Sequence, residues 1–143
     1  MKPSRQFEIA GRVPGRLRLR GPTDQALVEI DGVVLEAQLE LKSGEFVLCS
    51  TDDCPFEEVL HITLVSPTGK VLDTLDLGQA MQPGLFQNFV SLGDRAAEFD
   101  FFPEQRHRLE VRDAPCGLLT HILRRRRLAL TPTDQATTHD EPT

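Results

Sequence analysis

The sequence predicts an all-β protein: an antiparallel β-sandwich, or a partly open barrel, of about eight to ten short strands with at most one short helix. Two observations predict this class. Apolar and polar residues alternate with a period of two in several short segments, and turn-forming residues separate these segments at intervals of about eight to twelve residues. In addition, no long amphipathic helix is available to cover a core.

Length and composition are those of one soluble globular domain. The chain has 143 residues, of which 39% are hydrophobic and 27% are charged, and its net charge is −6. We expect a single domain over residues 1–130 and a disordered polar tail over 131–143, where the sequence has no periodicity. No apolar stretch resembles a membrane span or a secretory signal, so we expect a cytoplasmic protein.

The clearest strand is VVLEAQLELK, residues 33–42. Its alternation places five apolar residues on one face: Val33, Leu35, Ala37, Leu39 and Leu41. Asp31-Gly32 before it and Ser43-Gly44 after it are residue pairs that favour two-residue hairpin turns. The pattern therefore predicts a meander of three consecutive antiparallel strands over 26–30, 33–42 and 45–51, in which Cys49 packs as a small hydrophobe.

Further strands are predicted on both sides of this meander. Residues 61–66 and 70–77 flank Pro67-Thr68-Gly69, which predicts a hairpin loop. In RLRLR (16–20), Leu17 and Leu19 face inward and three arginines face outward. The remaining predicted strands are 85–92, which is also compatible with a short helix, 96–102 with Ala97, Phe99 and Phe101 inward, and 107–111 with Leu109 and Val111 inward.

The stretch STDDCPFEE, residues 50–58, combines four carboxylates with a cysteine and a proline. We interpret it as a structural turn, in which Pro55 begins one helical turn, Asp53 or Cys54 caps it, and Phe56 points into the core. A zinc site from Cys49, Cys54, His61 and Cys116 and a catalytic role for the loop are the alternatives. The spacing matches neither chemistry, so we expect no catalytic residue, no metal site, no cofactor and no enzymatic activity.

Arginine is the least ordinary feature of the composition, with 13 Arg against 3 Lys. The run Arg124-Arg125-Arg126-Arg127 fits three structures: a strand, a helix from about residue 118 with the apolar stripe Leu118, Leu119, Ile122 and Leu123, or an edge strand whose charges block pairing with other chains. A solvated or edge-protecting run is the simplest interpretation.

A second set of arginines, Arg16, Arg18 and Arg20, gives the sequence its main functional hypothesis. If these residues lie beside Arg124, Arg125, Arg126 and Arg127, they form a continuous guanidinium surface. We therefore expect a non-enzymatic protein-binding module or assembly subunit that docks an acidic protein surface, with a homodimer through sheet edges as a further possibility. The alternative is a phosphate-bearing ligand, nucleic acid or nucleotide, which the lack of Trp and Tyr makes less favourable.

One short resemblance bears on that alternative. Arg12 to Arg16, and Arg16 to Arg20, are similar to the Arg-x-x-x-Arg element with which PilZ domains bind cyclic di-GMP. The second PilZ motif, Asp/Asn-x-Ser-x-x-Gly, does not follow at the start of a strand, because the nearest Ser-Gly pair falls in the predicted turn at Ser43-Gly44. The similarity covers five residues, so the sequence predicts no family.

Overall fold

The computed structural model describes residues 1–22, 27–115 and 124–133, which form three antiparallel sheets without an α-helix. The five-stranded sheet has the order β1 (Lys2–Pro3), β5 (Val34–Glu40), β6 (Phe46–Thr51), β7 (Leu60–Val65), β8 (Val71–Leu77). The four-stranded sheet has the order β12 (Arg124–Thr133), β11 (Arg106–Pro115), β10 (Ala96–Asp100), β9 (Gln87–Ser91). The three-stranded sheet is β2 (Glu8–Val13), β3 (Arg16–Arg20), β4 (Leu27–Asp31). None of the three closes into a barrel, and the predicted all-β, sandwich-like class is confirmed.

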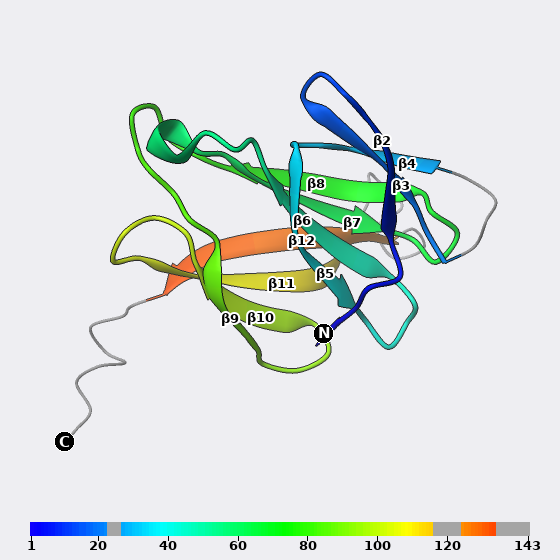
Figure 1. Ribbon diagram of the computed structural model, residues 1–143. Helices are drawn as coiled ribbons and strands as arrows, with labels where there is room; N and C mark the ends of the chain where they lie inside the picture. The colour runs from blue at the N-terminus through cyan, green and yellow to red at the C-terminus, as the bar shows by residue number, and fades with distance from the viewer. Residues whose placement is uncertain (23–26, 116–123, 134–143) are drawn as a thin grey trace.

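The five-stranded sheet is the middle layer (Figure 1). All six residues of β6 are buried, because both faces of this strand are covered. Val47 and Cys49 face the four-stranded sheet, and Phe46 and Leu48 face the three-stranded one. Full burial of one such apolar side chain stabilises the fold by about 1.5–3 kcal/mol. The sequence of β6 is therefore apolar on both faces, whereas strands with one exposed face alternate apolar and polar residues.

The predicted meander is wrong at its first connection. β4 pairs with β3, and β5 pairs with β1 and β6, so the chain passes from one sheet to the next at Asp31-Gly32 instead of reversing in a hairpin. The inner face of β4, with Val28 and Ile30, packs on the second apolar face of β6. Burial of that face favours the crossing over a hairpin, which would leave it exposed to water.

The predicted inward face of residues 33–42 is also corrected in part. The β5–β6 pairing shifts register between Leu35 and Ala37. Leu35 therefore packs toward the three-stranded sheet, whereas Ala37, Leu39 and Leu41 belong to the core on the opposite face. A β-bulge moves the residues beyond it to the other face, because side chains alternate with a period of two.

The other local predictions are largely confirmed. Residues 87–91 form a strand, the 41–45 and 66–70 loops join antiparallel neighbours, and Leu17, Leu19, Phe99 and Leu109 are buried as expected. The strands that the sequence did not predict are β1 and β2. β2 contains Gly11 next to a register shift and shows little alternation, so its pattern is weak.

The C-terminal region forms a strand from residue 124 onward, so the helical interpretation is wrong there. β12 is the outer strand of the four-stranded sheet, as the edge-strand interpretation expected, and it extends to Thr133, three residues into the predicted tail. Residues 116–123 and 134–143, including Cys116 and the predicted helical stripe, lie outside the described residues. Among the residues that are described, no helix is long and apolar enough to cross a membrane.

His107 of β11 is a histidine inside the apolar core. Its ring stacks on Phe99 with centroids 5.8 Å apart and meets Phe102 edge-on at 5.9 Å. Its Nδ1 atom is buried and has no hydrogen-bond partner among the described residues. Burial lowers the pKa of His107 below the ordinary value of 6.5, against the opposing charge of Asp100. The native state therefore holds this imidazole neutral.

This arrangement predicts a loss of stability in mild acid. Below pH 6.5 the unfolded chain protonates His107 and the native chain does not, so the free energy of unfolding falls as the pH drops toward the lowered pKa. Replacement His107→Phe should weaken this fall between about pH 7 and about pH 5, measured by urea denaturation. An identical pH dependence in both proteins would contradict the assignment.

Candidate functional site

Residues 50–58 form a turn that the protein's own side chains hold in place. Two of its residues, Asp52 and Phe56, belong to surface regions that differ in character, one polar and one apolar. Pro55–Glu57 form one 3-10 turn that begins with the proline, as predicted. The turn has no side-chain cap from Cys54. Instead, the buried carboxylate of Glu58 accepts the backbone N–H groups of Asp52 at 2.7 Å, Cys54 at 2.9 Å and Val59 at 3.1 Å. This one side chain closes the loop and fixes Asp52.

The prediction that Phe56 points into the core is wrong. Its side chain is 85% exposed, because the 3-10 turn lies at one end of the sheets, beyond the layers that could cover it (Figure 1). Cys49 is buried, as predicted, and burial raises the pKa of its thiol to about 12. Among the described residues, neither Cys49 nor Cys54 belongs to a group of converging metal ligands, so the structure gives no support to a site that these cysteines share with His61.

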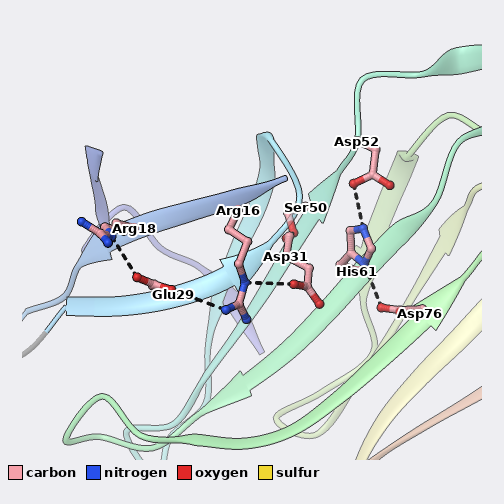
Figure 2. A network of polar contacts seen from close by, with 8 residues as sticks. All are labelled: Arg16, Arg18, Glu29, Asp31, Ser50, Asp52, His61 and Asp76. Atoms are coloured by element: carbon pink, nitrogen blue, oxygen red, sulfur yellow. Dashed lines mark hydrogen bonds and ion pairs between the residues drawn. The ribbon is translucent and has the colours of Figure 1, made fainter. Parts of the chain in front are cut away.

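His61 of β7 lies at the centre of a polar network (Figure 2). Its Nδ1 atom is 2.8 Å from Oδ1 of Asp76 on β8, and its Nε2 atom is 2.8 Å from Oδ1 of Asp52. Asp76 is the residue directly opposite His61 in the β7–β8 pairing. Partial burial by itself would lower the pKa of His61, but hydrogen bonds and charges from Asp76 and Asp52 outweigh it and raise that pKa above 6.5.

Asp31, at the end of β4, completes the cluster from the neighbouring sheet. Ligand atoms of Asp31, His61 and Asp76 all lie within 4.8 Å of one another, and they border a pocket of about 200 Å³. Figure 2 shows Asp31 and Asp76 on the side of the imidazole ring that faces away from Asp52. We call Asp31, Asp52, His61 and Asp76 the His61 cluster. It lies where the three-stranded and five-stranded sheets meet.

The backbone around Asp31 explains why this carboxylate reaches His61. Ser50 donates its hydroxyl to the carbonyl of Asp31 at 2.6 Å. The next residue is Gly32, with φ of 110°, and a Cβ atom there would lie 2.7 Å from the Ser50 hydroxyl oxygen. Only glycine permits this close crossing of β4 over β6 without strain. The Asp-Gly pair that suggested a hairpin is thus the crossing that positions Asp31.

The arginines of β3 face outward and bind acids of the adjacent strand. Arg16 donates to Asp31 at 3.1 Å and to Glu29 at 3.4 Å, and Arg18 donates to Glu29 at 2.8 Å. Arg20 is exposed at the end of the strand, and no ion pair of Arg20 is recorded among the described residues. Exposed pairs of this kind contribute about 0–1 kcal/mol each, so the outer face of this sheet is a charge-balanced surface.

The arginines of the 124–127 run lie in β12, in a different sheet. Arg126 is largely buried and donates to Glu45 in the 41–45 loop at 2.6 and 2.9 Å, and to Asp113 at 3.2 Å. Arg127 is half exposed and lies 3.4 Å from Asp73. For Arg124 and Arg125 only the backbone is within the described structure. Within the described side chains, the two arginine sets share no acidic partner.

The 3-10 turn and the loop between β8 and β9 lie at one end of the molecule (Figure 1), and they carry exposed apolar side chains that the sequence did not indicate. Phe56, Met81 and Leu85 are 85%, 84% and 61% exposed, and the Met81 backbone N–H donates to Glu57 at 2.6 Å, which ties the two loops together. Beside them is a pocket of about 460 Å³ with apolar walls from Pro55, Pro83, Leu85, Phe101, Phe102 and Pro103. We call Phe56, Met81, Leu85 and this pocket the apolar end.

The charges around the apolar end are acidic. Asp100 and Glu104 line the pocket, and Glu57 joins the two loops. The pocket lining includes neither lysine nor arginine, although Arg106 donates to Asp100 from outside it at 2.9 Å. Comparison of the chain with protein-family models, curated proteins and solved structures gave no match.

Proposed function

We propose that the chain is a non-enzymatic protein-binding module whose docking surface is the apolar end. The observation that carries the proposal is the exposure of two large apolar side chains, Phe56 at 85% and Met81 at 84%, beside an apolar-walled pocket. Exposed apolar side chains are ordinary when scattered, but a contiguous group of them next to a pocket is typical of a docking surface.

The shape of this end suits the burial of one anchoring side chain. A pocket of about 460 Å³ accommodates an aromatic or leucine side chain. Leu85 lines this pocket, and the exposed Phe56 follows the lining residue Pro55 in the chain. Methionine adapts its shape to different neighbours, and a few buried aromatic and aliphatic anchors contribute most of the binding energy at such interfaces. Docking would therefore remove from water the surface that the fold leaves exposed.

Charge complementarity defines the occupant. Glu57 and Glu104 place negative charge at the edge of the apolar surface, whereas Asp100 is paired with Arg106. We infer a partner segment that presents one large apolar side chain flanked by lysine or arginine. Complementary charges of this kind accelerate encounter and disfavour acidic partners. The acidic surroundings also disfavour nucleic acid at this end, because its phosphates would be repelled.

Docking of an acidic protein or a phosphate-bearing ligand through the arginine segments remains the alternative prediction. Arg16 and Arg18 are paired with Glu29 and Asp31, and Arg126 is paired with Glu45. A ligand at these positions would have to displace a carboxylate of the same chain. Of the arginines in these segments whose side chains are described, Arg20 is exposed and has no ion pair with another described residue.

Selection from a random dodecapeptide display library tests the proposal on the full chain. We expect enriched peptides with one aromatic or leucine residue next to basic residues. Fluorescence polarisation should then show a loss of affinity of at least about tenfold for Phe56→Ser combined with Met81→Ser, because each replacement removes apolar surface that the partner would bury without adding a charge. The control is Ile9→Ser, which truncates an apolar residue on β2 that is 40% exposed and lies outside the proposed surface, and it should leave the affinity unchanged.

Three results would contradict the proposal. Acidic peptides that lose binding on Arg20→Ala would move the docking face to the arginines. Equal losses in the double variant and in Ile9→Ser would show non-specific hydrophobic binding. Self-association of the wild type in sedimentation velocity that disappears in the double variant would identify a second copy of the chain, and not a basic peptide, as the occupant.

A further inference from the structure

We propose that the His61 cluster is a binding site for a first-row divalent metal ion such as Zn²⁺, with His61, Asp31 and Asp76 as ligands and Asp52 as the group that orients the imidazole. The site is independent of the apolar end, since its residues come from β4, β7 and β8 and border a different pocket. It also differs from the cysteine-containing site that the sequence suggested, because neither described cysteine takes part.

The side chains of His61, Asp31 and Asp76 have ligand atoms of the right kind for a divalent ion, and these atoms point toward one another. One imidazole nitrogen and two carboxylate oxygens are ligands that first-row divalent ions accept readily. The three ligand atoms lie within 4.8 Å of one another, while ligands at about 2.1 Å from one ion lie about 3.4 Å apart. Asp31 and Asp76 have exposed side chains, so small rotations bring their oxygens to the required spacing.

The position of Asp52 is the observation that separates this cluster from a chance group of acids. Metal-bound histidines commonly donate the ring N–H that does not face the metal to a carboxylate, which fixes the ring orientation. Asp52 takes that position on Nε2, at 2.8 Å, and Glu58 in turn holds the Asp52 backbone. The ring is therefore oriented with Nδ1 toward Asp31 and Asp76, on the side where an ion would sit (Figure 2).

The surroundings leave room for the rest of a coordination shell. The bordering pocket of about 200 Å³ accommodates water ligands, and Thr74 is another polar residue in its lining. Arg16 approaches Asp31 through Oδ1 at 3.1 Å, which leaves the second carboxylate oxygen for an ion. Arg16 would then orient Asp31 without touching the ion, as Asp52 orients His61.

A structural ion pair is the competing explanation. In that case the protonated imidazole of His61 bridges Asp52 and Asp76, and the cluster joins strands without any ligand. The two explanations differ in what they require of metal binding. A metal site must bind one ion per chain through Nδ1 and must lose affinity when Asp31 is replaced, although Asp31 has no recorded hydrogen bond to His61.

Calorimetric titration with Zn²⁺ at about pH 8, where the imidazole releases its proton more readily, tests the proposal. The protein should be the full chain with Cys54→Ser and Cys116→Ser, so that thiols do not contribute. We expect one ion per chain, a loss of affinity of at least about tenfold for Asp31→Asn and Asp76→Asn, and a larger loss for His61→Gln. Circular dichroism of each variant should show that the fold is unchanged.

Glu29→Gln is the matched control, because it removes a carboxylate from the same pocket wall without removing a proposed ligand. Its affinity should stay within about twofold of the parent. Nitrogen-15 spectra should show Nδ1 of His61 bound to the ion and Nε2 still protonated. Equal losses for Glu29→Gln and Asp31→Asn, or His61 resonances that do not respond to saturating Zn²⁺, would overturn the site.

Discussion

Replacing Arg126 by alanine is expected to lower the free energy of unfolding by about 3 kcal/mol, whereas the same replacement at Arg127 should lower it by less than about 1 kcal/mol. The two residues are neighbours in one arginine run and differ in burial: the side chain of Arg126 is 17% exposed and that of Arg127 is 47% exposed. Arg127 thus serves as the matched control for length, charge and strand propensity.

The physical reason lies with the partner of Arg126. The Glu45 side chain is 8% exposed, and its carboxylate accepts two short hydrogen bonds from the guanidinium. Without Arg126 this charge stays in a poorly solvated position with only the Ser43 hydroxyl as a described side-chain donor, at 2.9 Å. Removal of one partner of a buried ion pair is much more costly than removal of an exposed pair, because a desolvated charge is left behind.

Chemical denaturation of Arg126→Ala, Arg127→Ala and a double variant, Glu45→Gln with Arg126→Met, would measure this difference. The double variant should regain more than half of the stability lost in Arg126→Ala, since no uncompensated charge remains. Equal, small losses at Arg126 and Arg127 would instead support the interpretation of the run as fully solvated.

The second large effect is expected at Glu58. Replacement Glu58→Ala should destabilise the protein by about 3 kcal/mol, because one buried carboxylate accepts three backbone N–H groups, two from the 50–58 turn and one from Val59. These donors have few alternatives once the acceptor is lost. Glu58→Gln, which keeps one acceptor oxygen without the charge, should have an intermediate effect.

The adjacent Glu57 provides the control for Glu58. Its carboxylate accepts one exposed backbone donor, that of Met81, so Glu57→Ala should change the free energy of unfolding by less than about 1 kcal/mol. Urea denaturation of the three variants compares the two neighbours directly. If Glu57→Ala is as destabilising as Glu58→Ala, the turn depends on general acidic character and not on the three hydrogen bonds to Glu58.

Much of the strand content followed from local pattern, because period-two alternation and turn residues are properties of short segments. The inward faces of residues 16–20, 96–102 and 107–111 were predicted correctly for this reason. The proline-initiated turn at Pro55 was predicted from the fixed backbone angle of proline. Phe56 was assigned inward, which was wrong, because a local pattern does not say where the sheets end.

The arginine run shows a different limit. Sequence alone left strand and helix open for it, since four consecutive charges have no apolar periodicity. Pairing with β11 makes it a strand, and burial of Glu45 beside Arg126 gives one arginine a structural partner that no sequence separation indicates. The two residues are far apart in the chain and meet because the 41–45 loop lies against the start of β12.

The sequence by itself determined the all-β class, most strand positions and several inward faces, because these depend on neighbouring residues. The His61 cluster depended on register and layer crossing. Ser66 and Lys70 close the β7–β8 hairpin in a register that would put Leu75 opposite His61, but a register shift between Leu64 and Val65 puts Asp76 there. Asp31 arrives from another sheet because burying the second face of β6 favours a crossing over a hairpin. Strand register and the crossing between sheets depend on the burial of surfaces that are distant in the sequence, and a local pattern does not contain this information.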